Sequence, residues 1–261
     1  MSEQQWRFIV DGFHSARHNM EADCALMSEG GQGLIQPTVR VYGWSEPAIT
    51  VGYSQQYESE LDVDRCRAEA IDIVRRPTGG RALLHHLEVT YAVAAPVSLP
   101  PFDRGLKATF GAVSEALLAG LRTLGVRGDL NTHKRPSSGG PRRSPACFAA
   151  LNHCEITVDG KKLVGSAQKR TARSFLQHGS LILEPDHDRF VSLLKFECEE
   201  RREDMRRHLL HSTTGLSEVC GRPVSFQEAA EALREGFRQT FSGHWTEEEI
   251  LLPALKRVHG E

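Results

Sequence analysis

The pair Asp159-Gly160 constrains the fold of this chain more than any other two residues. It separates a run rich in β-formers, residues 154–158, from a second such run, residues 161–167. Asp-Gly between two β-rich runs is among the strongest short-range signals for a β-hairpin, because both residues tolerate positive φ. A third β-rich run, residues 174–183, follows directly. The sequence therefore predicts a fold centred on a sheet that contains this hairpin.

The return strand of the hairpin begins with two adjacent lysines, Lys161 and Lys162. Leu163 and Val164 are adjacent and both apolar. A strand with such a pair is expected to be covered on both faces, as interior strands are. Either Lys161 or Lys162 can then be drawn inward, and alternation alone does not say which of the two.

The remaining elements follow from periodicity and punctuation. The sequence predicts helices at residues 14–27, 61–70 and 107–124, a pair of strands at residues 38–44 and 48–52, and a strand at residues 71–75. After Pro185 it predicts helices at residues 188–196, 200–210 and 226–241. Ser225 followed by Glu228 forms a capping-box pattern before the last helix. We expect one domain, residues 1–261, with a helical C-terminal extension from about residue 187.

Composition excludes several classes of protein. The chain has 261 residues and a formal net charge of −2, so no global charge draws it to nucleic acid. No apolar run reaches membrane-spanning length, and the first residues lack the pattern of a secretion signal, so the expected compartment is the cytoplasm. Six scattered cysteines indicate reduced thiols. No metal site is expected, because the candidate ligands show no repeated spacing; these are His85, His86, His153, His178 and the cysteines.

A second motif begins at Arg75 and reads Arg-Arg-Pro-Thr-Gly-Gly-Arg-Ala. Gly79 and Gly80 follow a predicted strand and would let main-chain N–H groups approach a ligand closely. The two arginines before them, Arg75 and Arg76, could hold an anionic or polar group. A hairpin turn with a solvated basic flank explains the same pattern equally well.

Two cysteines and a basic segment precede the hairpin. Cys147 is followed by Phe148, whereas Cys154 belongs to the first hairpin strand and is expected to be a core residue. Residues 132–145 are rich in proline, glycine and bases and are expected to form a loop. Its bases are either solvated or a docking site for an acidic partner; they are Lys134, Arg135, Arg142 and Arg143.

Together these segments resemble the lipoate-protein ligase and octanoyltransferase family. The resemblance covers most of the chain and rests on six stretches in order: residues 19–23, 37–44, 75–82, 160–168 and 176–183, and the helical tail around residues 208–210. It implies an α+β fold with a mixed, largely antiparallel sheet and flanking helices, like that of biotin and lipoate protein ligases and related to class II synthetases. ATP-using ligases of the family carry a third glycine and then His-Asp in the second motif. Here Arg81 and His86 stand at the third-glycine and Asp positions.

The sequence is most similar to the cysteine-dependent octanoyltransferases of the LipM type. The resemblance implies that Cys147 is the nucleophile and that Lys162 favours its thiolate, which a nearby ammonium is able to do. Small residues beside the acyl group would leave room for backbone N–H donors to the carbonyl oxygen. The substrate-binding residues that the resemblance implies are Arg76, Thr78, Gly79, Gly80, His85, Gly165, Ser166, Ala167 and His178.

The expected reaction moves an octanoyl group from octanoyl-acyl carrier protein, through a Cys147 thioester, to a lysine of a lipoyl domain. That domain belongs to a glycine-cleavage H protein or to a 2-oxoacid dehydrogenase subunit. The expectation includes no cofactor, no nucleic acid, no membrane and a monomeric state. The alternatives are an amidotransferase between lipoyl domains, an ATP-dependent lipoate ligase, and a carrier-binding module without catalysis.

Overall fold

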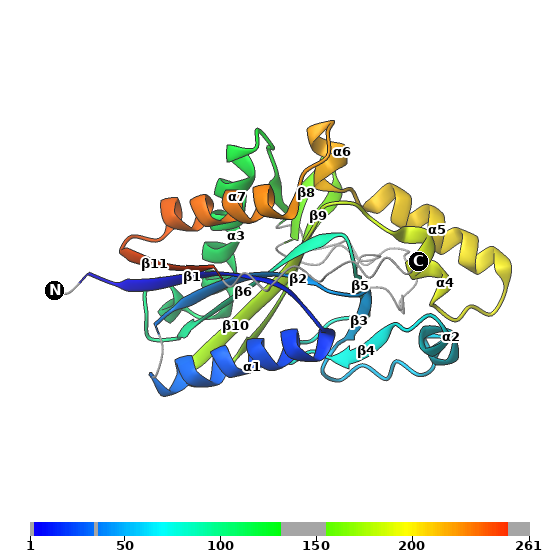
Figure 1. Cartoon of the computed structure of the whole chain (residues 1–261), viewed down its shortest axis with the longest axis horizontal. Coiled ribbons are helices and arrows are strands. Elements are labelled where there is room, and N and C mark those ends of the chain that lie inside the picture. Colours follow the sequence, from blue (N-terminus) through cyan, green and yellow to red (C-terminus); the bar gives the residue numbers. More distant parts are fainter. Residues whose placement is uncertain (1–2, 34–35, 132–154, 250–261) are drawn as a thin grey trace, which may run out of the picture.

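An eight-stranded mixed sheet forms the centre of the protein (Figure 1). The computed structural model describes residues 3–33, 36–131 and 155–249. In these ranges the strands of the large sheet lie in the order β11-β1-β2-β6-β10-β9-β8-β7. Only β11–β1 and β1–β2 pair in parallel. The strands are β1 (Gln5–His14), β2 (Thr38–Trp44), β6 (Glu88–Pro96), β7 (Asp129–Asn131), β8 (Glu155–Val158), β9 (Lys161–Arg170), β10 (Ser174–Ile182) and β11 (His244–Glu249).

A small second sheet and the helices surround this centre. The small sheet has the order β4-β3-β5 and consists of β3 (Ala48–Val51), β4 (Asp72–Arg75) and β5 (Leu83–His85). The helices are α1 (Ala16–Gln32), α2 (Val63–Ala68), the 3₁₀ turn η1 (Phe102–Arg104), α3 (Leu106–Thr123), α4 (His187–Ser192), α5 (Glu199–Ser212), α6 (Leu216–Cys220) and α7 (Phe226–Thr240). Helix α1 lies on one face of the large sheet, and α3 and α7 lie on the other (Figure 1).

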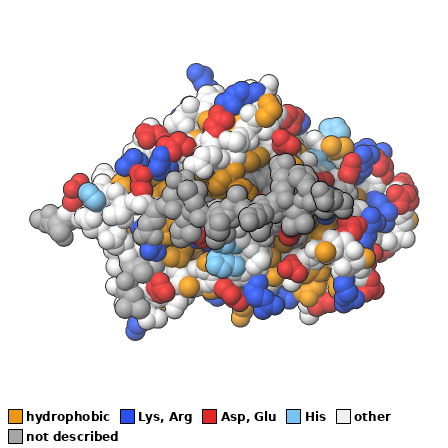
Figure 2. All heavy atoms as spheres, in the orientation of Figure 1, with side chains coloured by type: hydrophobic (Ala, Val, Ile, Leu, Met, Phe, Trp, Pro, Cys, Tyr) orange, Lys and Arg blue, Asp and Glu red, His pale blue; other side chains and the backbone are white. Residues whose placement is uncertain are grey.

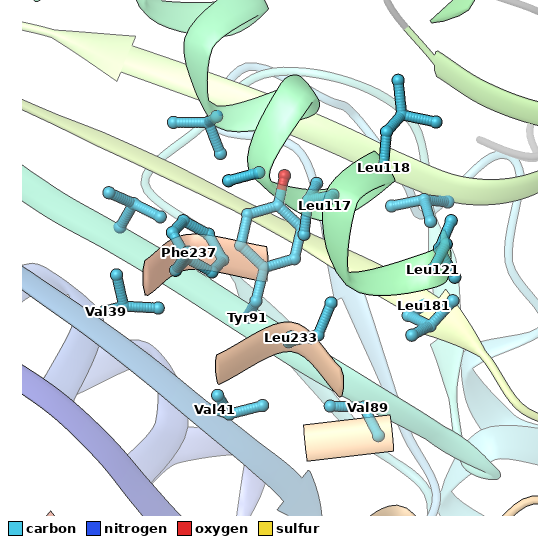
Figure 3. Close-up of a cluster of buried hydrophobic side chains, with 14 of the residues drawn as sticks. Val39, Val41, Val89, Tyr91, Leu117, Leu118, Leu121, Leu181, Leu233 and Phe237 are labelled. Carbon is cyan, nitrogen blue, oxygen red and sulfur yellow. The ribbon is translucent and has the colours of Figure 1, made fainter. Parts of the chain in front are cut away.

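The face under α3 and α7 is apolar. Alternate residues of each strand point to it, as the period of two requires. Figure 3 shows Val41, Val89 and Tyr91 from the strands meeting Leu117 of α3 and Phe237 of α7. The two helices also touch backbone to backbone: a Cβ placed on Gly236 would lie 2.3 Å from the carbonyl oxygen of Ala116. The main core of the protein therefore lies on this face.

The face under α1 is partly polar. Ser15 caps α1 by accepting a hydrogen bond from the N–H of His18, and Gly33 ends it in the left-handed conformation. The buried side of α1 includes Met20 and Leu26 and also Asp23, a fully buried carboxylate. Buried charges are found where partners are supplied. We call this side of the sheet the α1 face, and the opposite side the apolar face.

The predicted hairpin is present. Asp159 and Gly160 have φ of 50° and 76°, and they join β8 to β9. The pairing between the two strands shifts by one residue, since Ile156 lies opposite Val164 and Thr157 opposite Lys162. Such a bulge changes the alternation, and it places Lys162 on the same face as Gly165. Lys162 is the inward lysine, fully buried, whereas the side chain of Lys161 is 37% exposed.

The predicted fold class is confirmed, with differences in detail. The two strands at residues 38–44 and 48–52 do not pair with each other. Strand β2 already has β1 and β6 along its two edges, so β3 begins the second sheet instead. Strands β1, β5, β6, β7 and β11 were not predicted. The segment after residue 185 contains strand β11 in addition to helices. Its last helix, α7, packs into the main core. No helix among the described residues is long and apolar enough to span a membrane.

Candidate functional site

A pocket opens on the α1 face, between α1, the strands β9 and β10, and the small sheet. It encloses about 440 Å³ of empty space, part of which is open to solvent. Met20, Trp44 and Leu83 supply apolar surface, and polar side chains stand among them. A concave, largely apolar site with a few placed polar groups is the usual form of a small-ligand site. Six predicted substrate-binding residues line it: Arg76, His85, Gly165, Ser166, Ala167 and His178.

Small residues on β9 and β10 make room for the pocket. Gly165 lies opposite Ser180, and Gly179 lies opposite Ser166. A Cβ on Gly179 would stand 2.2 Å from the carbonyl oxygen of Gly165, so no larger residue fits there without moving the strands. The hydroxyl of Ser166 lies 2.6 Å from that of Tyr91 on the apolar face. Ser166 therefore presents its main chain, rather than its side chain, to the pocket.

His178 belongs to a chain of buried polar groups. Its Nδ1 lies 2.8 Å from Oδ2 of Asp23, and its Nε2 lies 2.7 Å from the hydroxyl of Thr78. Asp23 also accepts hydrogen bonds from the hydroxyl of Tyr42 at 2.9 Å and from the guanidinium of Arg40 at 2.9 Å. Burial, followed by the charge of Asp23, raises the pKa of Tyr42 well above 10, so its hydroxyl stays a donor. The predicted residues Thr78 and His178 are thus joined directly.

His85 belongs to a second chain of the same kind. Its Nδ1 lies 2.7 Å from Oε1 of Glu88, and its Nε2 lies 2.7 Å from the hydroxyl of Thr50. Oε1 of Glu88 also accepts from the hydroxyls of Thr90 at 2.5 Å and Ser180 at 2.7 Å. Burial acts to raise the pKa of Glu88, but the electrostatic interaction with His85 and the hydrogen bonds from His85, Thr90 and Ser180 outweigh it and lower the pKa.

Trp44 covers the second chain on the pocket side. Its ring stacks on His85 with a centroid distance of 4.0 Å and an interplanar angle of 17°, and its Nε1 donates to Thr90 at 2.8 Å. The imidazole of His85 is therefore held from its face as well as from both ring nitrogens. Such a group has little rotational freedom.

The two arginines of the second motif bind main-chain oxygens. Nη1 of Arg75 donates to the carbonyl oxygens of Gly52, Tyr53 and Gln55. The guanidinium of Arg76 donates to the carbonyl oxygens of Thr50, Gly79 and Arg81 and to the hydroxyl of Thr50. The contacts of Arg75 hold the segment that follows β3, and those of Arg76 hold the loop between β4 and β5. The sequence suggested an anion or a solvated flank for these arginines, and the structure places both on their own backbone.

Gly79 and Gly80 lie apart from the pocket lining and are exposed. Gly80 has φ of 111°, and its carbonyl oxygen would lie 2.1 Å from a Cβ on Gly52. The absence of a side chain at Gly52 therefore allows the close approach of two backbone segments, and Gly80 adopts a positive φ that favours glycine. Arg81, at the third-glycine position of the ligases, turns away to pair with Glu60 at 2.7 Å.

Lys162 is a buried cation on the same face as the pocket. Its Nζ lies 2.5 Å from Oε1 of Glu155, and the two side chains are 0% and 2% exposed. A buried pair of this kind loses about 3–5 kcal/mol when one partner is removed, because the other charge is left in the interior. Lys162 is not among the pocket-lining residues. Cys147 and Cys154 lie outside the described residues, so the proximity of Cys147 to Lys162 stays a prediction.

One group of described residues could hold a metal ion. Asp11, His14 and His18 have potential ligand atoms within 4.8 Å of one another. Oδ2 of Asp11 is already bound to Nε of Arg40 at 2.6 Å. The adjacent cation opposes the approach of a second positive charge. The group lies at the junction of β1 and α1, away from the pocket lining.

The sequence reasoning assigned no site role to Asp23, Glu88, Thr50 or Trp44. Two signals were present. Asn19 and Asp23 share the helical face of Met20, which is a polar interruption of an apolar stripe. Glu88 begins an otherwise β-rich apolar strand. A charged residue in such a position must have buried partners.

Comparison with known proteins shows which family the chain resembles. Residues 15–238 match the family described as lipoyl protein ligase A/B catalytic domain. A protein of Kyrpidia tusciae named octanoyltransferase LipM is 39% identical over 241 residues, which cover 90% of this chain and 87% of that protein. The protein of the same name from Bacillus subtilis is 34% identical over 262 residues, covering 99% and 94% of the two chains.

Solved structures agree on the fold. A bi-partite lipoate protein ligase from Thermoplasma acidophilum has a TM-score of 0.73 at 22% identity, covering 95% of this chain and 88% of that one. Lipoate-protein ligase A bound with ATP also has a TM-score of 0.73 at 22% identity, covering 96% and 90%. At this identity the likeness concerns the fold alone. The resemblance expected from the sequence motifs is confirmed by these relatives, and the chain belongs to the lipoyl protein ligase A/B catalytic domain family.

Proposed function

We propose that the chain is an acyltransferase of protein lipoylation that moves an octanoyl group in two steps through Cys147. In the first step the Cys147 thiolate attacks the thioester carbonyl of octanoyl-acyl carrier protein. A new C–S bond forms, the old one breaks, and the carrier thiol leaves. In the second step a lysine amine of a lipoyl domain attacks the enzyme thioester. The amide forms, the amine loses a proton, and the Cys147 thiolate is released.

The observation that carries this proposal is the pocket on the α1 face beside the small-residue strand β9. Its apolar wall suits an alkyl chain, and about 440 Å³ lies within the range of small-ligand sites. Lys162 stands on the same face three residues before Gly165. An ammonium near the acyl end of the pocket is the group that a thiolate nucleophile needs. No cofactor is required, because a thioester is already activated.

The sharpest test uses intact-protein mass. Incubation with octanoyl-acyl carrier protein is expected to add one octanoyl group, and addition of a lipoyl domain is expected to remove it. Cys147→Ser is expected to abolish a thiol-linked adduct, which hydroxylamine cleaves from the parent. Cys24→Ser is the matched control, because Cys24 is an exposed thiol. An adduct that persists in Cys147→Ser and disappears in Cys24→Ser would contradict the assignment.

Lys162 is tested separately from Cys147. Lys162→Met with Glu155→Leu removes both members of the buried pair, which avoids leaving a lone charge in the interior. The double variant is expected to fold and to acylate Cys147 at least tenfold more slowly at neutral pH, with the difference shrinking as pH rises toward the ordinary thiol pKa of about 8.5. An unchanged acylation rate would remove Lys162 from the mechanism.

The proposed donor and acceptor also distinguish the alternatives. An amidotransferase would take its acyl group from an octanoylated lipoyl domain and not from the carrier protein. An ATP-dependent ligase would form an adenylate from free lipoate and ATP. A module without catalysis would bind a carrier without turnover. The hydrogen bonds of Arg75 and Arg76 to backbone carbonyls favour the transferase, since these side chains are engaged within the protein.

The proposal also covers location and partners. We place the reaction in the cytoplasm, with a monomeric enzyme. The basic residues expected to meet an acidic carrier protein or lipoyl domain lie at 134, 135, 142 and 143, outside the described residues. On the face in Figure 2, acidic and basic side chains of the described residues are intermingled. Salt dependence of the acylation rate, compared between the parent and charge-reversal variants of these four residues, tests the role of the segment.

A further inference from the structure

Two chains of buried polar groups support the loop between β4 and β5: one ends at Thr78 within the loop, and the other ends at Thr50 of β3, which binds Arg76. Each runs from a carboxylate to a histidine to a threonine hydroxyl: Asp23 to His178 to Thr78, and Glu88 to His85 to Thr50. The six residues are between 0% and 6% exposed. They come from different elements, yet the order of chemical groups is the same. This repetition calls for a common physical explanation.

The positions of the protons follow from the acceptors. An ionised carboxylate only accepts hydrogen bonds, so Nδ1 of each histidine must carry a proton. The opposite nitrogen, Nε2, faces a threonine hydroxyl at 2.7 Å in both chains. Among the residues that the structure describes, the Thr78 hydroxyl contacts no other acceptor. A buried hydroxyl proton without an acceptor is costly, so the hydroxyl donates to an unprotonated Nε2.

In the second chain of groups, a different hydrogen bond indicates that Nε2 of His85 is also unprotonated. The hydroxyl oxygen of Thr50 accepts a hydrogen bond from Nη1 of Arg76 at 3.2 Å. Among the described residues, Nε2 of His85 is the acceptor within reach of the Thr50 proton, and a buried hydroxyl proton without an acceptor is costly, so the hydroxyl donates to Nε2. Each group in the sequence Arg76 to Thr50 to His85 to Glu88 donates to the next. The direction of every hydrogen bond in this chain is then fixed.

We propose that His85 and His178 are positioning residues that act as neutral Nδ1–H imidazoles, each accepting a threonine hydroxyl to hold the Arg76–Gly80 loop at the pocket. The inference rests on the proposed function in one respect, since it takes this pocket as the acyl site. Thr78 lies within the loop itself, and Thr50 holds Arg76, which binds the carbonyl oxygens of Gly79 and Arg81. Both imidazoles also line the pocket, so the loop and the pocket wall share the same supports.

The first experiment reads the protons directly. Protein labelled with ¹⁵N-histidine is observed at neutral pH, and the ring signals are assigned with His85→Gln and His178→Gln. For both residues we expect a protonated Nδ1 and an unprotonated, hydrogen-bonded Nε2. Thr78→Val should move the Nε2 signal of His178 toward that of an unbonded nitrogen and leave His85 unchanged. A doubly protonated ring, or a proton on Nε2, would overturn the proposal without reference to activity.

The second experiment measures the consequence for transfer. Thr78→Val keeps the size of the side chain and removes the hydroxyl, while Thr78→Ser keeps the hydroxyl. We expect Thr78→Val to lower kcat/KM for octanoyl transfer about 10- to 100-fold, as misplacement of a supporting loop does, and Thr78→Ser to restore most of it. Thr109→Val is the matched control, because Thr109 is a fully buried hydroxyl bonded to Gly105 on the opposite face.

The two experiments separate the possible failures. If the parent protein transfers no octanoyl group but shows the expected imidazole protons, the proposed function fails and the inferred proton arrangement stands. If Thr78→Val transfers as fast as the parent, or if it loses no more than Thr109→Val does, the positioning role is overturned. Equal loss in Thr78→Val and Thr78→Ser would likewise contradict it, since the hydroxyl would not be the group that matters.

Discussion

The two faces of the large sheet are built on different physical principles. The apolar face packs valine, leucine and aromatic side chains against α3 and α7, and its stability comes from area removed from water. The α1 face buries charges and hydroxyls that satisfy one another, centred on Arg40, Asp23 and Glu88. Apolar packing does not depend on the direction of individual contacts. Polar packing requires each donor to meet its acceptor, and the pocket described above opens on the α1 face.

The difference shows why a binding site is placed where it is. Hydrophobic contacts carry no direction, so they hold the strands together without orienting any one side chain. Directed hydrogen bonds fix His85 and His178 in single orientations at the pocket wall. A site that must present groups in a set geometry gains from such supports. The apolar face thus holds the strands together, and the α1 face fixes the orientation of the side chains at the pocket.

The largest effect is expected from Arg40→Met. The guanidinium of Arg40 binds Asp11 and Asp23. Burial works against its charge, but the electrostatic interactions with Tyr42, Asp23 and Asp11 outweigh burial and raise the pKa of Arg40. Its removal leaves two carboxylates buried, so we expect at least the roughly 3–5 kcal/mol lost when a buried pair is broken. Urea unfolding measures the change. Arg67→Met, at an exposed pair, should cost less than about 0.5 kcal/mol.

Phe237→Ala tests the apolar face. Phe237 is fully buried against Phe8 and Phe241, and its truncation should lower the free energy of unfolding by about 3–5 kcal/mol. If the faces are as distinct as described, the octanoyl transfer rate per folded molecule stays within about twofold of the parent. Leu210→Ala, at a side chain 47% exposed, is the control for stability. A large loss of transfer in folded Phe237→Ala would contradict the division of roles.

Much of the fold was predictable because the signals are local. The Asp159-Gly160 turn needs only its neighbours, and Ser225 meets the N–H of Glu228 three residues later. Pairing of β1 with β11 joins residues about 240 positions apart, and no local pattern announces it. Strand β2 was predicted with the wrong neighbour for the same reason. The neighbours of a strand depend on the whole sheet, whereas the tendency to form a strand depends on the sequence of the segment itself.

The site was predictable in part. The family resemblance implied Gly165, Ala167, His85 and His178, and these residues line one pocket. The supporting carboxylates were missed, because a charged residue read by itself is expected at the surface. Which of Lys161 and Lys162 turns inward depends on a bulge that adds one residue to the alternation. These properties depend on contacts between distant segments, so a reading of one segment does not contain them.

The same substitution on the two faces gives a direct comparison. Tyr42→Phe removes a hydroxyl that donates to the Asp23 carboxylate, and Tyr91→Phe removes one bonded to Ser166 and Gln177. Burial raises the pKa of Tyr91 to about 12, so its hydroxyl is protonated near neutral pH. We expect losses of about 1.5–3 kcal/mol for Tyr42→Phe and about 0.5–1.5 kcal/mol for Tyr91→Phe in thermal or urea unfolding. Equal losses would erase the distinction between charged and neutral partners.

The smallest expected effect concerns Glu88 and depends on pH. The pKa of Glu88 lies below its ordinary value of 4.5 in the folded protein, because the electrostatic interaction with His85 and three hydrogen bonds outweigh burial, which acts to raise it. A carboxylate whose pKa is lowered by folding stabilises the protein fully above the unfolded value. Its contribution is lost as the pH falls through the folded pKa. The relevant window therefore begins near pH 4.5 and extends downward.

Glu88→Gln keeps an oxygen where Oε1 accepts its hydrogen bonds and removes only the charge. At pH 7 we expect the variant to be less stable by about 1 kcal/mol, since hydrogen bonds to a charged acceptor are stronger than neutral ones. Because the substituted amide cannot take up a proton in this range, the difference from the parent should shrink as the pH falls below about 4.5. Glu115→Gln, at a side chain 58% exposed, should differ from its parent by less than about 0.5 kcal/mol. A gap for Glu88→Gln that stays constant from pH 7 to pH 3 would show that the ionised carboxylate contributes nothing to the α1 face beyond its shape.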